Sequence, residues 1–475
     1  MNHKTFALIV LSALSCIDLY SQTQIGNNVN GISVGDVFGS NTAISSDGSI
    51  IAAAGSVGMT GPGGSSRVFQ NVNGVWTLYG TDINGENFGN LGSASISLSA
   101  DGDTFANTVL GETIVRVFAY DDVTGIWNQK GSDIINNTSV GRYGYSIKLS
   151  ADGNIIAIGA PDSPIVPTAG VTQVLQYNSG SWNQIGNDIV GVNPTEHSGR
   201  SVDLSSDGNT VAIMNDNSAR VYESDSGTWT LVGNEIPAVG GQSPNRAVSL
   251  SADGTVLAIG EADFTDSLIQ RGRVRVFRNV SGSWNQIGNA ILGEVAYYRS
   301  GWSVNLSGNG DLLVIGEPGS TSGSTDEGRT RIFQNVNDSW IQIGNSILGD
   351  DIENYSGRSV VISGDGTTLI SGAPFNDDNG VDSGQIKVFS ISSLLSTEEF
   401  ESEQIKIFPN PSKHQFSVVL PPSVELEKIA VYNSLGRLIM TSTHNVINTS
   451  NLSSGLYVVE IKFDQSRIIR KVLID

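Results

Sequence analysis

Short runs of alternating apolar and polar residues, separated by Asp-Gly or Asn-Gly, recur along most of the chain. The phrase Leu-Ser, one residue, Asp-Gly and an apolar run appears in seven variants, 46 to 56 residues apart. Asp, Asn and Gly tolerate the positive φ of a tight hairpin, so each phrase predicts two strands joined by a turn. The turns are Asp47-Gly48, Asp101-Gly102, Asp152-Gly153, Asp207-Gly208, Asp253-Gly254, Asn309-Gly310 and Asp365-Gly366.

A second phrase follows each of the first six turns: Trp, two residues, an apolar residue and usually Gly-Asn. Its tryptophans are Trp76, Trp127, Trp182, Trp229, Trp284 and Trp340. Each unit then holds four strand signals, as in residues 201–205 and 256–260, the alternating run 273–277, and a last strand that opens with the Trp. Seven such units predict an all-β fold, a seven-bladed β-propeller. Turn geometry explains the Asp residues, and packing between blades explains the Trp residues.

The seventh unit is incomplete, because no Trp phrase follows its third strand at residues 385–389. The missing strand is found at the other end of the chain. Residues 22–27, Gln-Thr-Gln-Ile-Gly-Asn, match Trp-Asn-Gln-Ile-Gly-Asn of residues 182–187 from the third position on. We therefore predict a propeller over residues 22–393 that is closed by its N-terminal strand, which removes the open edges of an arc.

Residues 1–21 are predicted to be a signal peptide. Lys4 precedes an apolar run of about 12 residues, which suits a signal-peptide core and is too short to span a bilayer. Two processing alternatives stay open: a weak lipobox at residues 13–16 would lipidate Cys16, whereas cleavage after Ser21 would leave Gln22 first. The repeat favours the second alternative, because Gln22 falls where other units have the Trp.

Charge and composition exclude several classes of function. The net charge is −21, nearly all of it in the propeller region, and this disfavours nucleic acid and anionic membranes as partners. Cys16 is the only cysteine, and His197, His414 and His444 are scattered, so no zinc-binding pattern appears. We find no phosphate-binding loop and no Gly-x-Ser-x-Gly motif, and we predict no metal site or catalytic residue.

The units resemble a known repeat. Gly144-Tyr145-Ser146-Ile147 followed by Ile158-Gly159-Ala160-Pro161 is similar to the FG-GAP repeats of integrin-type propellers, over about residues 22–393. Many such repeats carry an Asp-rich calcium loop, but here the Asp-Gly turns lack the preceding aspartates. Calcium takes six to eight oxygens, and the oxygen-rich segment 376–382 has irregular spacing. We favour a solvated acidic loop there and keep calcium as the alternative.

A different pattern begins after the propeller. Residues 394–403 are polar and acidic and are predicted to be a linker. Residues 404–475 contain alternating strands split by Pro and Gly turns, which predict a small Ig-like β-sandwich.

This last segment resembles the C-terminal sorting domain of type IX secretion substrates in Bacteroidetes. The residues that carry the resemblance are Pro409, Asn410, Pro411, Gly436, Arg437, Gly455 and Tyr457. The resemblance implies the type IX secretion machinery as a partner and export across the outer membrane. It also implies removal of the domain, with the body released or attached to the cell surface. A generic Ig-like module is the alternative.

One column of the repeat alignment is chemically unusual for an acidic protein. The residue before the first strand is Tyr145, Arg200, Arg246, Trp302 and Arg358 in units three to seven, whereas units one and two have Ser40 and Ala94. If the first strand is innermost, these side chains ring one mouth of the central channel, where Arg and aromatic groups suit carboxylates, sulfates or sugar faces. In the alternative interpretation each Arg pairs with a loop acid and each aromatic ring packs between blades.

Three classes of function remain open. We favour a secreted or cell-surface binding or adhesion protein, without catalysis or cofactor, whose propeller takes an extracellular glycan or protein ligand. An enzyme acting on extracellular polysaccharide or peptide is the alternative, and a scaffold without a ligand is the third.

Overall fold

The computed structural model describes residues 22–55, 65–81, 83–84, 95–109, 113–135, 142–162, 169–238, 246–267, 269–319, 327–395, 406–420, 426–433, 437–463 and 466–474. The predicted signal peptide, residues 396–403 of the predicted linker and residues 404–405 of the predicted sandwich lie outside this part. The chain divides into two compact units, Met1–Leu394 and Leu395–Asp475, and each is described by itself.

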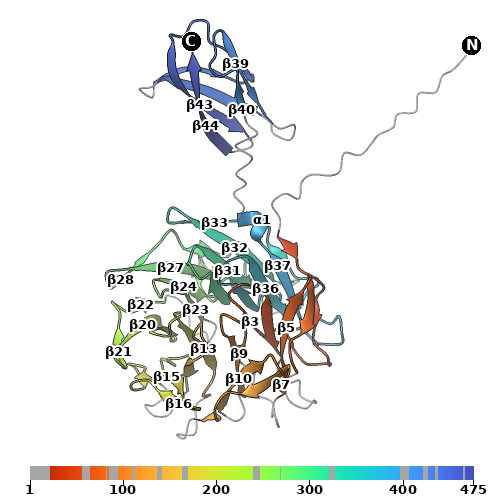
Figure 1. Cartoon of the computed structure of the whole chain (residues 1–475). Helices are drawn as coiled ribbons and strands as arrows, with labels where there is room; N and C mark the ends of the chain where they lie inside the picture. The colour runs from red at the N-terminus through yellow and green to blue at the C-terminus, as the bar shows by residue number, and fades with distance from the viewer. Residues whose placement is uncertain are drawn as a thin grey trace, which may run out of the picture. The chain divides into compact units, whose positions relative to one another are not determined.

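The first unit repeats one antiparallel sheet of five strands (Figure 1). In the third repeat, β13 (Ser146–Leu149), β14 (Ile155–Ala160), β15 (Val171–Asn178) and β16 (Ser181–Gln184) pair in this order. The fifth strand, β17 (Ile189–Val190), pairs with the start of β15. The sequence analysis predicted the first four strands and missed the fifth, because two residues are too short to show an alternating pattern.

Within the described residues, seven sheets share this topology. The first sheet contains β3 (Asn41–Ile44), β4 (Ile50–Ala54), β5 (Ser65–Val72), β6 (Val75–Leu78) and β7 (Ile83–Asn84), and the second contains β8 (Ile96–Leu98), β9 (Thr104–Val109), β10 (Ile114–Asp121), β11 (Ile126–Gln129) and β12 (Ile134–Ile135). The fourth sheet contains β18 (Ser201–Leu204), β19 (Thr210–Met214), β20 (Ser218–Asp225), β21 (Thr228–Leu231) and β22 (Ile236–Pro237), and the fifth contains β23 (Arg246–Leu250), β24 (Val256–Glu261), β27 (Arg273–Val280), β28 (Ser283–Gln286) and β29 (Ile291–Leu292). The sixth sheet contains β30 (Ser303–Leu306), β31 (Leu312–Glu317), β32 (Arg329–Val336), β33 (Ser339–Gln342) and β34 (Ile347–Leu348), and the seventh contains β35 (Ser359–Ile362), β36 (Thr368–Ala373) and β37 (Gln385–Ser390) with β1 (Thr23–Gln24) and β2 (Val29–Asn30). A small hairpin of β25 (Thr265–Asp266) and β26 (Ile269–Gln270) lies between β24 and β27, and α1 (Ser392–Leu395) follows β37.

Side-chain hydrogen bonds fix the turn between the first two strands of each sheet. In the third sheet, Ser150 Oγ donates to Asp152 Oδ1 at 2.6 Å, and the N–H of Asn154 donates to the same oxygen at 3.0 Å. Burial alone would raise the pKa of Asp152, but these hydrogen bonds outweigh it and hold the pKa below its usual value. The same Ser–Asp bond recurs at Asp47, Asp101, Asp207, Asp253 and Asp365. The interpretation of the Asp residues as turn formers is confirmed.

The same turns link neighbouring sheets in a cycle. The first strands contact one another in the order β3, β8, β13, β18, β23, β30 and β35, and β35 contacts β3 again. One backbone hydrogen bond of 2.7–2.9 Å joins each pair of turns. The bonds run from the N–H of Ser46 to Ala100, Ala100 to Ala151, Ala151 to Ser206, Ser206 to Ala252, Ala252 to Gly308, Gly308 to Gly364 and Asp365 back to Ser46. This arrangement is propeller-like, with the first strands innermost.

The tryptophans lie between sheets, as the sequence predicts. Trp182 Nε1 donates to the carbonyl oxygen of Lys130 in the preceding sheet at 2.7 Å. Its ring covers Gly131, where a Cβ atom would lie 3.0 Å from Trp182 Cδ1, so this glycine makes room for the ring. Trp76, Trp127, Trp229 and Trp284 donate to the preceding sheet in the same way.

Apolar side chains fill the spaces between neighbouring sheets. Val115 and Val117 of β10, for example, pack in one buried cluster with Ile147 and Ile158 of the next sheet. The core of the unit is therefore a series of layers, each shared by two sheets, and its stability comes from burial.

The N-terminal residues complete the sheet that contains β37. Thr23 pairs with Ser390, and Val29 pairs with Ile386. Gln22 takes the position that other sheets give to Trp: its Nε2 donates to the carbonyl oxygen of Asn345 at 2.8 Å. This pairing agrees with the match between residues 22–27 and 182–187.

Deleting residues 22–32 should therefore lower the melting temperature and promote aggregation, because β37 would become an open strand edge. Calorimetry and size-exclusion chromatography would measure both effects. Deletion of residues 396–405 is the control and should change neither. An unaltered melting temperature in the first variant would contradict the role of these residues in closing the sheet.

The second unit contains two sheets. β38 (Lys406–Phe408), β39 (Gln415–Val419) and β42 (Val446–Asn448) form one. The other has the order β41 (Leu438–Ser442), β40 (Leu426–Asn433), β43 (Gly455–Phe463) and β44 (Ser466–Ile474). One apolar core joins both sheets, with Phe416 and Ile447 from the first and Ile429, Val459 and Val472 from the second.

Candidate functional site

A repeated turn leads into the first strand of several sheets and positions the side chains at its two ends. The N–H of Tyr145 donates to the carbonyl oxygen of Arg142 at 3.0 Å, and that of Trp302 donates to Arg299 at 3.1 Å. Gly301, at the third position, has φ 88°, which favours glycine. The turn brings each arginine over the aromatic ring that follows it, with 5.1 Å from guanidinium to ring centroid in both turns.

Arg358 lies at the centre of the cluster that these turns create. Its guanidinium stacks on Trp302, 4.8 Å from the ring centroid. Burial lowers the pKa of Arg358; Tyr145 and Tyr355 oppose this effect, and the nearby Arg299 adds to it. Among the described residues, no carboxylate forms an ion pair with Arg358. We call Tyr145, Arg299, Trp302, Tyr355 and Arg358 the mouth; it unites three of the five predicted site residues.

Arg200, in contrast, has a carboxylate partner. Its Nε lies 2.6 Å from Oδ1 of Asp216, and His197 Nδ1 lies 2.6 Å from the other oxygen of the same carboxylate. His197 Nε2 is 3.8 Å from Asp162, which also pairs with Arg142. These polar contacts link the third and fourth sheets, and they agree with the interpretation of Arg200 as a residue paired with a loop acid.

The other positions that precede first strands, Arg246, Ser40 and Ala94, contribute no described charged or aromatic side chain to the site. Arg246 begins β23 and its backbone pairs with Glu261, while its side chain lies outside the described part. Ser40 is buried, and its hydroxyl donates to the carbonyl oxygen of Val37 at 2.7 Å. Ala94 also lies outside the described residues. The described side chains of the column that are cationic or aromatic thus come from the third, fourth, sixth and seventh sheets.

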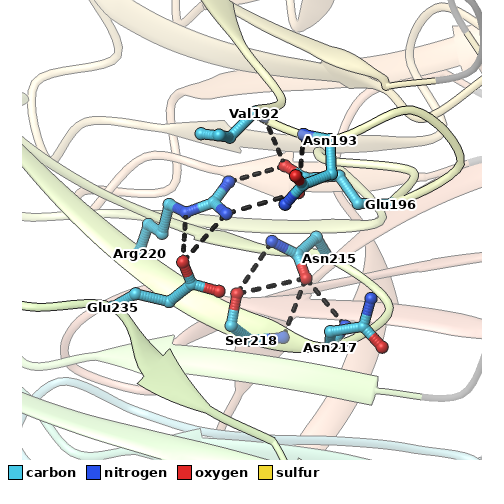
Figure 2. A network of polar contacts seen from close by, with 8 residues as sticks. All are labelled: Val192, Asn193, Glu196, Asn215, Asn217, Ser218, Arg220 and Glu235. Atoms are coloured by element: carbon cyan, nitrogen blue, oxygen red, sulfur yellow. Dashed lines mark hydrogen bonds and ion pairs between the residues drawn. The ribbon is translucent and has the colours of Figure 1, made fainter.

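The structure shows a second basic column that the sequence analysis missed. It occupies one position of the third strand in each sheet: Arg67, Arg116, Gln173, Arg220, Arg275, Arg331 and Lys387. Figure 2 shows Arg220 between Glu196, at 2.6 Å, and Glu235, at 3.0 Å. Burial alone would raise the pKa of Glu196, but hydrogen bonds from Arg220 and from the N–H groups of Val192 and Asn193 hold it below its usual value.

Two glutamates that end second strands each bind an arginine of this column and the arginine two residues before it. Glu317 is fully buried and accepts from Nε of Arg329 at 2.6 Å and from Nε of Arg331 at 2.7 Å. Glu261 binds the equivalent arginines of β27. A basic residue in six of seven third strands was a usable signal in the sequence. Arg116, Arg220, Arg275 and Arg331 each have a carboxylate partner, which indicates a structural role.

The oxygen-rich loop at residues 376–382 is held by its own hydrogen bonds. Asp377 Oδ1 accepts from the N–H of Asp382 at 2.8 Å, and Asn376 Oδ1 accepts from the N–H of Asp378 at 2.9 Å. Asp378 Oδ2 accepts from Gln385 Nε2 at 2.6 Å. Burial, followed by the charge of Asp377, raises the pKa of Asp382. These oxygens stabilise turns, which agrees with the favoured acidic loop, and calcium stays the untested alternative.

Residues of the predicted sorting motif bind the last strand and the hairpins of the second unit. The side chain of Asn410 bridges β44, donating to Lys471 at 3.0 Å and accepting from the N–H of Leu473 at 2.9 Å. Tyr457 Oη donates to Ser453 at 3.0 Å. The N–H of Arg437 donates to Asn433 Oδ1 at 3.0 Å, and Gly436 lies outside the described part.

Residues 406–475 match the family described as the secretion system C-terminal sorting domain. The chain thus carries a type IX sorting domain, which directs the protein to the cell surface or into the medium. In the part of the chain that the structure describes, no helix has the length and apolar character needed to span a membrane. No curated protein sequence is significantly similar to the chain.

Several solved structures are similar to the chain. The β-propeller domain of Myceliophteria thermophila Cps50 (Swd1) is 11% identical, over 77% of this chain and 99% of that one, with a TM-score of 0.49. The C-terminal WD40 domain of Sif2 is 12% identical, over 78% and 98%, with a TM-score of 0.47. The periplasmic gluconolactonase PpgL of Pseudomonas aeruginosa is 14% identical, over 66% and 86%, with a TM-score of 0.47. No functional residue is carried over from these proteins.

Proposed function

We propose that this exported protein is a non-catalytic binding protein whose mouth takes an anionic extracellular ligand. Arg358 carries the proposal, because its partly buried guanidinium has no carboxylate ion-pair partner among the described residues and lies near a second arginine, Arg299. Two close cations repel each other, and a bound anion would offset this repulsion. A guanidinium stacked on Trp302 keeps its N–H edge free for a carboxylate or sulfate.

An enzyme acting on polysaccharide or peptide is the alternative function. Most glycosidases use two carboxyl groups that flank the scissile bond. Near the mouth, Asp162 and Asp216 pair with Arg142, His197 and Arg200, and Asp263 lies 3.4 Å from Arg299. Carboxylates engaged in this way support binding rather than hydrolysis.

We also propose how the sheets of each unit are arranged. The seven sheets would be the blades of a closed FG-GAP-like propeller over residues 22–393, after removal of the signal peptide. The cyclic hydrogen bonds between turns and the pairing of β1 with β37 support this view. Residues 404–475 would form an Ig-like sandwich, for which the core shared by two sheets is the support.

The proposed function predicts a specific effect of Arg358→Ala. Binding of oligogalacturonate and of poly-L-glutamate, measured by titration calorimetry, should weaken about tenfold, since a hydrogen bond to a charged group contributes about 1.5–3 kcal/mol. Both affinities should also fall with added salt. Arg278→Ala, which removes an exposed arginine paired with Asp338, is the control. Equal binding by the two variants would contradict the proposal.

A further inference from the structure

Exposed aliphatic and aromatic side chains occupy the loops that lead into the first strands. Four of these loops are described: residues 31–39, 191–199, 293–301 and 349–357, which we call the entry loops. Each carries at least one exposed large apolar residue: Val34 is 70% exposed, Val192 69%, Tyr297 51% and Ile352 50%. Each entry loop therefore presents apolar surface to solvent, and the feature is systematic.

The entry loops open on the same face of the ring as the mouth. Each loop ends where a first strand begins, and Trp302 and Arg358 directly precede two of these strands. Antiparallel pairing places the loop between the second and third strands at this face too, and Val381 of such a loop, 62% exposed, lies next to Val34. Exposed apolar side chains, interspersed with exposed acids such as Glu294 and Asp351, therefore surround the mouth, and apolar residues that gather on one face mark interaction sites.

Backbone hydrogen bonds fix the base of each entry loop. The N–H of Gly191 donates to Gly170 at 3.0 Å, that of Gly293 to Gly272 at 3.1 Å and that of Gly349 to Gly328 at 3.0 Å; the first loop repeats the bond from Gly31 to Gly384 at 2.8 Å. A Cβ atom on Gly191 would lie 2.1 Å from the carbonyl oxygen of Ala169, so the backbones pack closely here. The loops are anchored before any ligand arrives, which lowers the entropic cost of binding.

Arginines occupy the aromatic faces at the mouth. The ring of Trp302 is in contact with the guanidinium groups of Arg299 and Arg358, and Arg142 lies over the ring of Tyr145. Tyr355 packs edge-on against Phe375, with ring centroids 5.1 Å apart. Sugar rings are usually bound on open aromatic faces, and these rings are already engaged. The mouth provides positive charge, and the entry loops provide aliphatic side chains for contact.

We propose that the partner of this face is a polypeptide segment in which a carboxylate is flanked by aliphatic side chains. The carboxylate would bind Arg358 and Arg299, and the neighbouring side chains would pack on the entry loops. This inference rests on the proposed anion-binding function of the mouth. A carboxylated glycan has the charge but lacks aliphatic side chains for Val34, Val192 and Ile352, so it is the weaker candidate.

The test uses the full chain and two labelled probes in fluorescence polarisation titrations: a ten-residue peptide of alternating Glu and Leu, and oligogalacturonate. The wild type should bind the peptide at least about tenfold more tightly. The double variant Val192→Ser/Ile352→Ser should weaken peptide binding about tenfold, because two apolar contacts are lost, and leave oligogalacturonate unchanged. Val123→Ser is the control, since Val123 is 93% exposed on a turn at the opposite end of its sheet.

The outcomes separate this inference from the proposed function. Unchanged peptide affinity in the double variant, equal or tighter binding of oligogalacturonate by the wild type, or no peptide binding up to millimolar concentration would each overturn the polypeptide partner. If Arg358→Ala then still weakens oligogalacturonate, the anion-binding mouth stands without it. If Arg358→Ala affects neither probe, the proposed function fails. Thermal melting of each variant checks that its fold is intact.

Discussion

Replacing Glu317 by Gln should lower the free energy of unfolding by about 3–5 kcal/mol. The carboxylate of Glu317 is fully buried and binds both Arg329 and Arg331. Gln keeps the shape but removes the charge, so two guanidinium groups remain in the interior, and among the described residues only the exposed Glu294 still pairs with them. Urea unfolding followed by tryptophan fluorescence would measure the change.

An exposed ion pair of the same protein provides the control. Asp338 lies 2.6 Å from Arg278, and its side chain is 58% exposed. Asp338→Asn should change the stability by less than about 1 kcal/mol, because water screens such pairs. If the two variants lose the same amount, the buried position of Glu317 has no special energetic importance and our account of the basic column is wrong.

Removing residues 406–475 should prevent export and trap the protein in the periplasm of a host with a type IX secretion system. These residues form the sorting domain, whereas the sheets of the first unit use none of them in their pairing. The truncated protein should therefore melt like the first unit of the intact chain. Immunoblots of periplasm, cell surface and medium would give the distribution.

A point variant refines this test. Asn410→Ala removes the amide that bridges β44, and we expect partial loss of export with an accompanying loss of stability of the second unit. Lys413→Ala, an exposed residue of the same segment, should export normally. Normal extracellular amounts of the truncated protein would refute the sorting role in this chain.

The sequence predicted the elements whose signals are local or repeated. The Ser-x-Asp-Gly turns and the Trp phrases encode contacts that recur in each sheet, so their spacing revealed the units. Gln22 was recognised because the residues after it match a repeat. The ion-pair partners of the basic column were harder to predict. Glu196, one of the two acids that bind Arg220, comes from an entry loop, whereas Glu317, which binds Arg331, ends the second strand. No fixed spacing in the sequence therefore connects the pairs.

The candidate site was predicted in part for a similar reason. Register alone placed Tyr145, Trp302 and Arg358 in one column, and the structure brings them together. Arg299 and Tyr355 were missed because they lie three residues earlier, across a turn whose geometry returns their side chains to the same place. The signal for them was a recurring four-residue turn. Its second and third residues are Ser-Gly, and its last residue is the one in the column.

β37 lies between β36 on one side and β1 with β2 on the other. All its ladder hydrogen bonds are made before the chain leaves the sheet at Ser390. A protease that cuts between residues 396 and 405 would therefore leave every strand pairing of the described residues intact. The first unit would keep its fold after the sorting domain is removed, so this cleavage at the cell surface would not lower the stability of the exported protein.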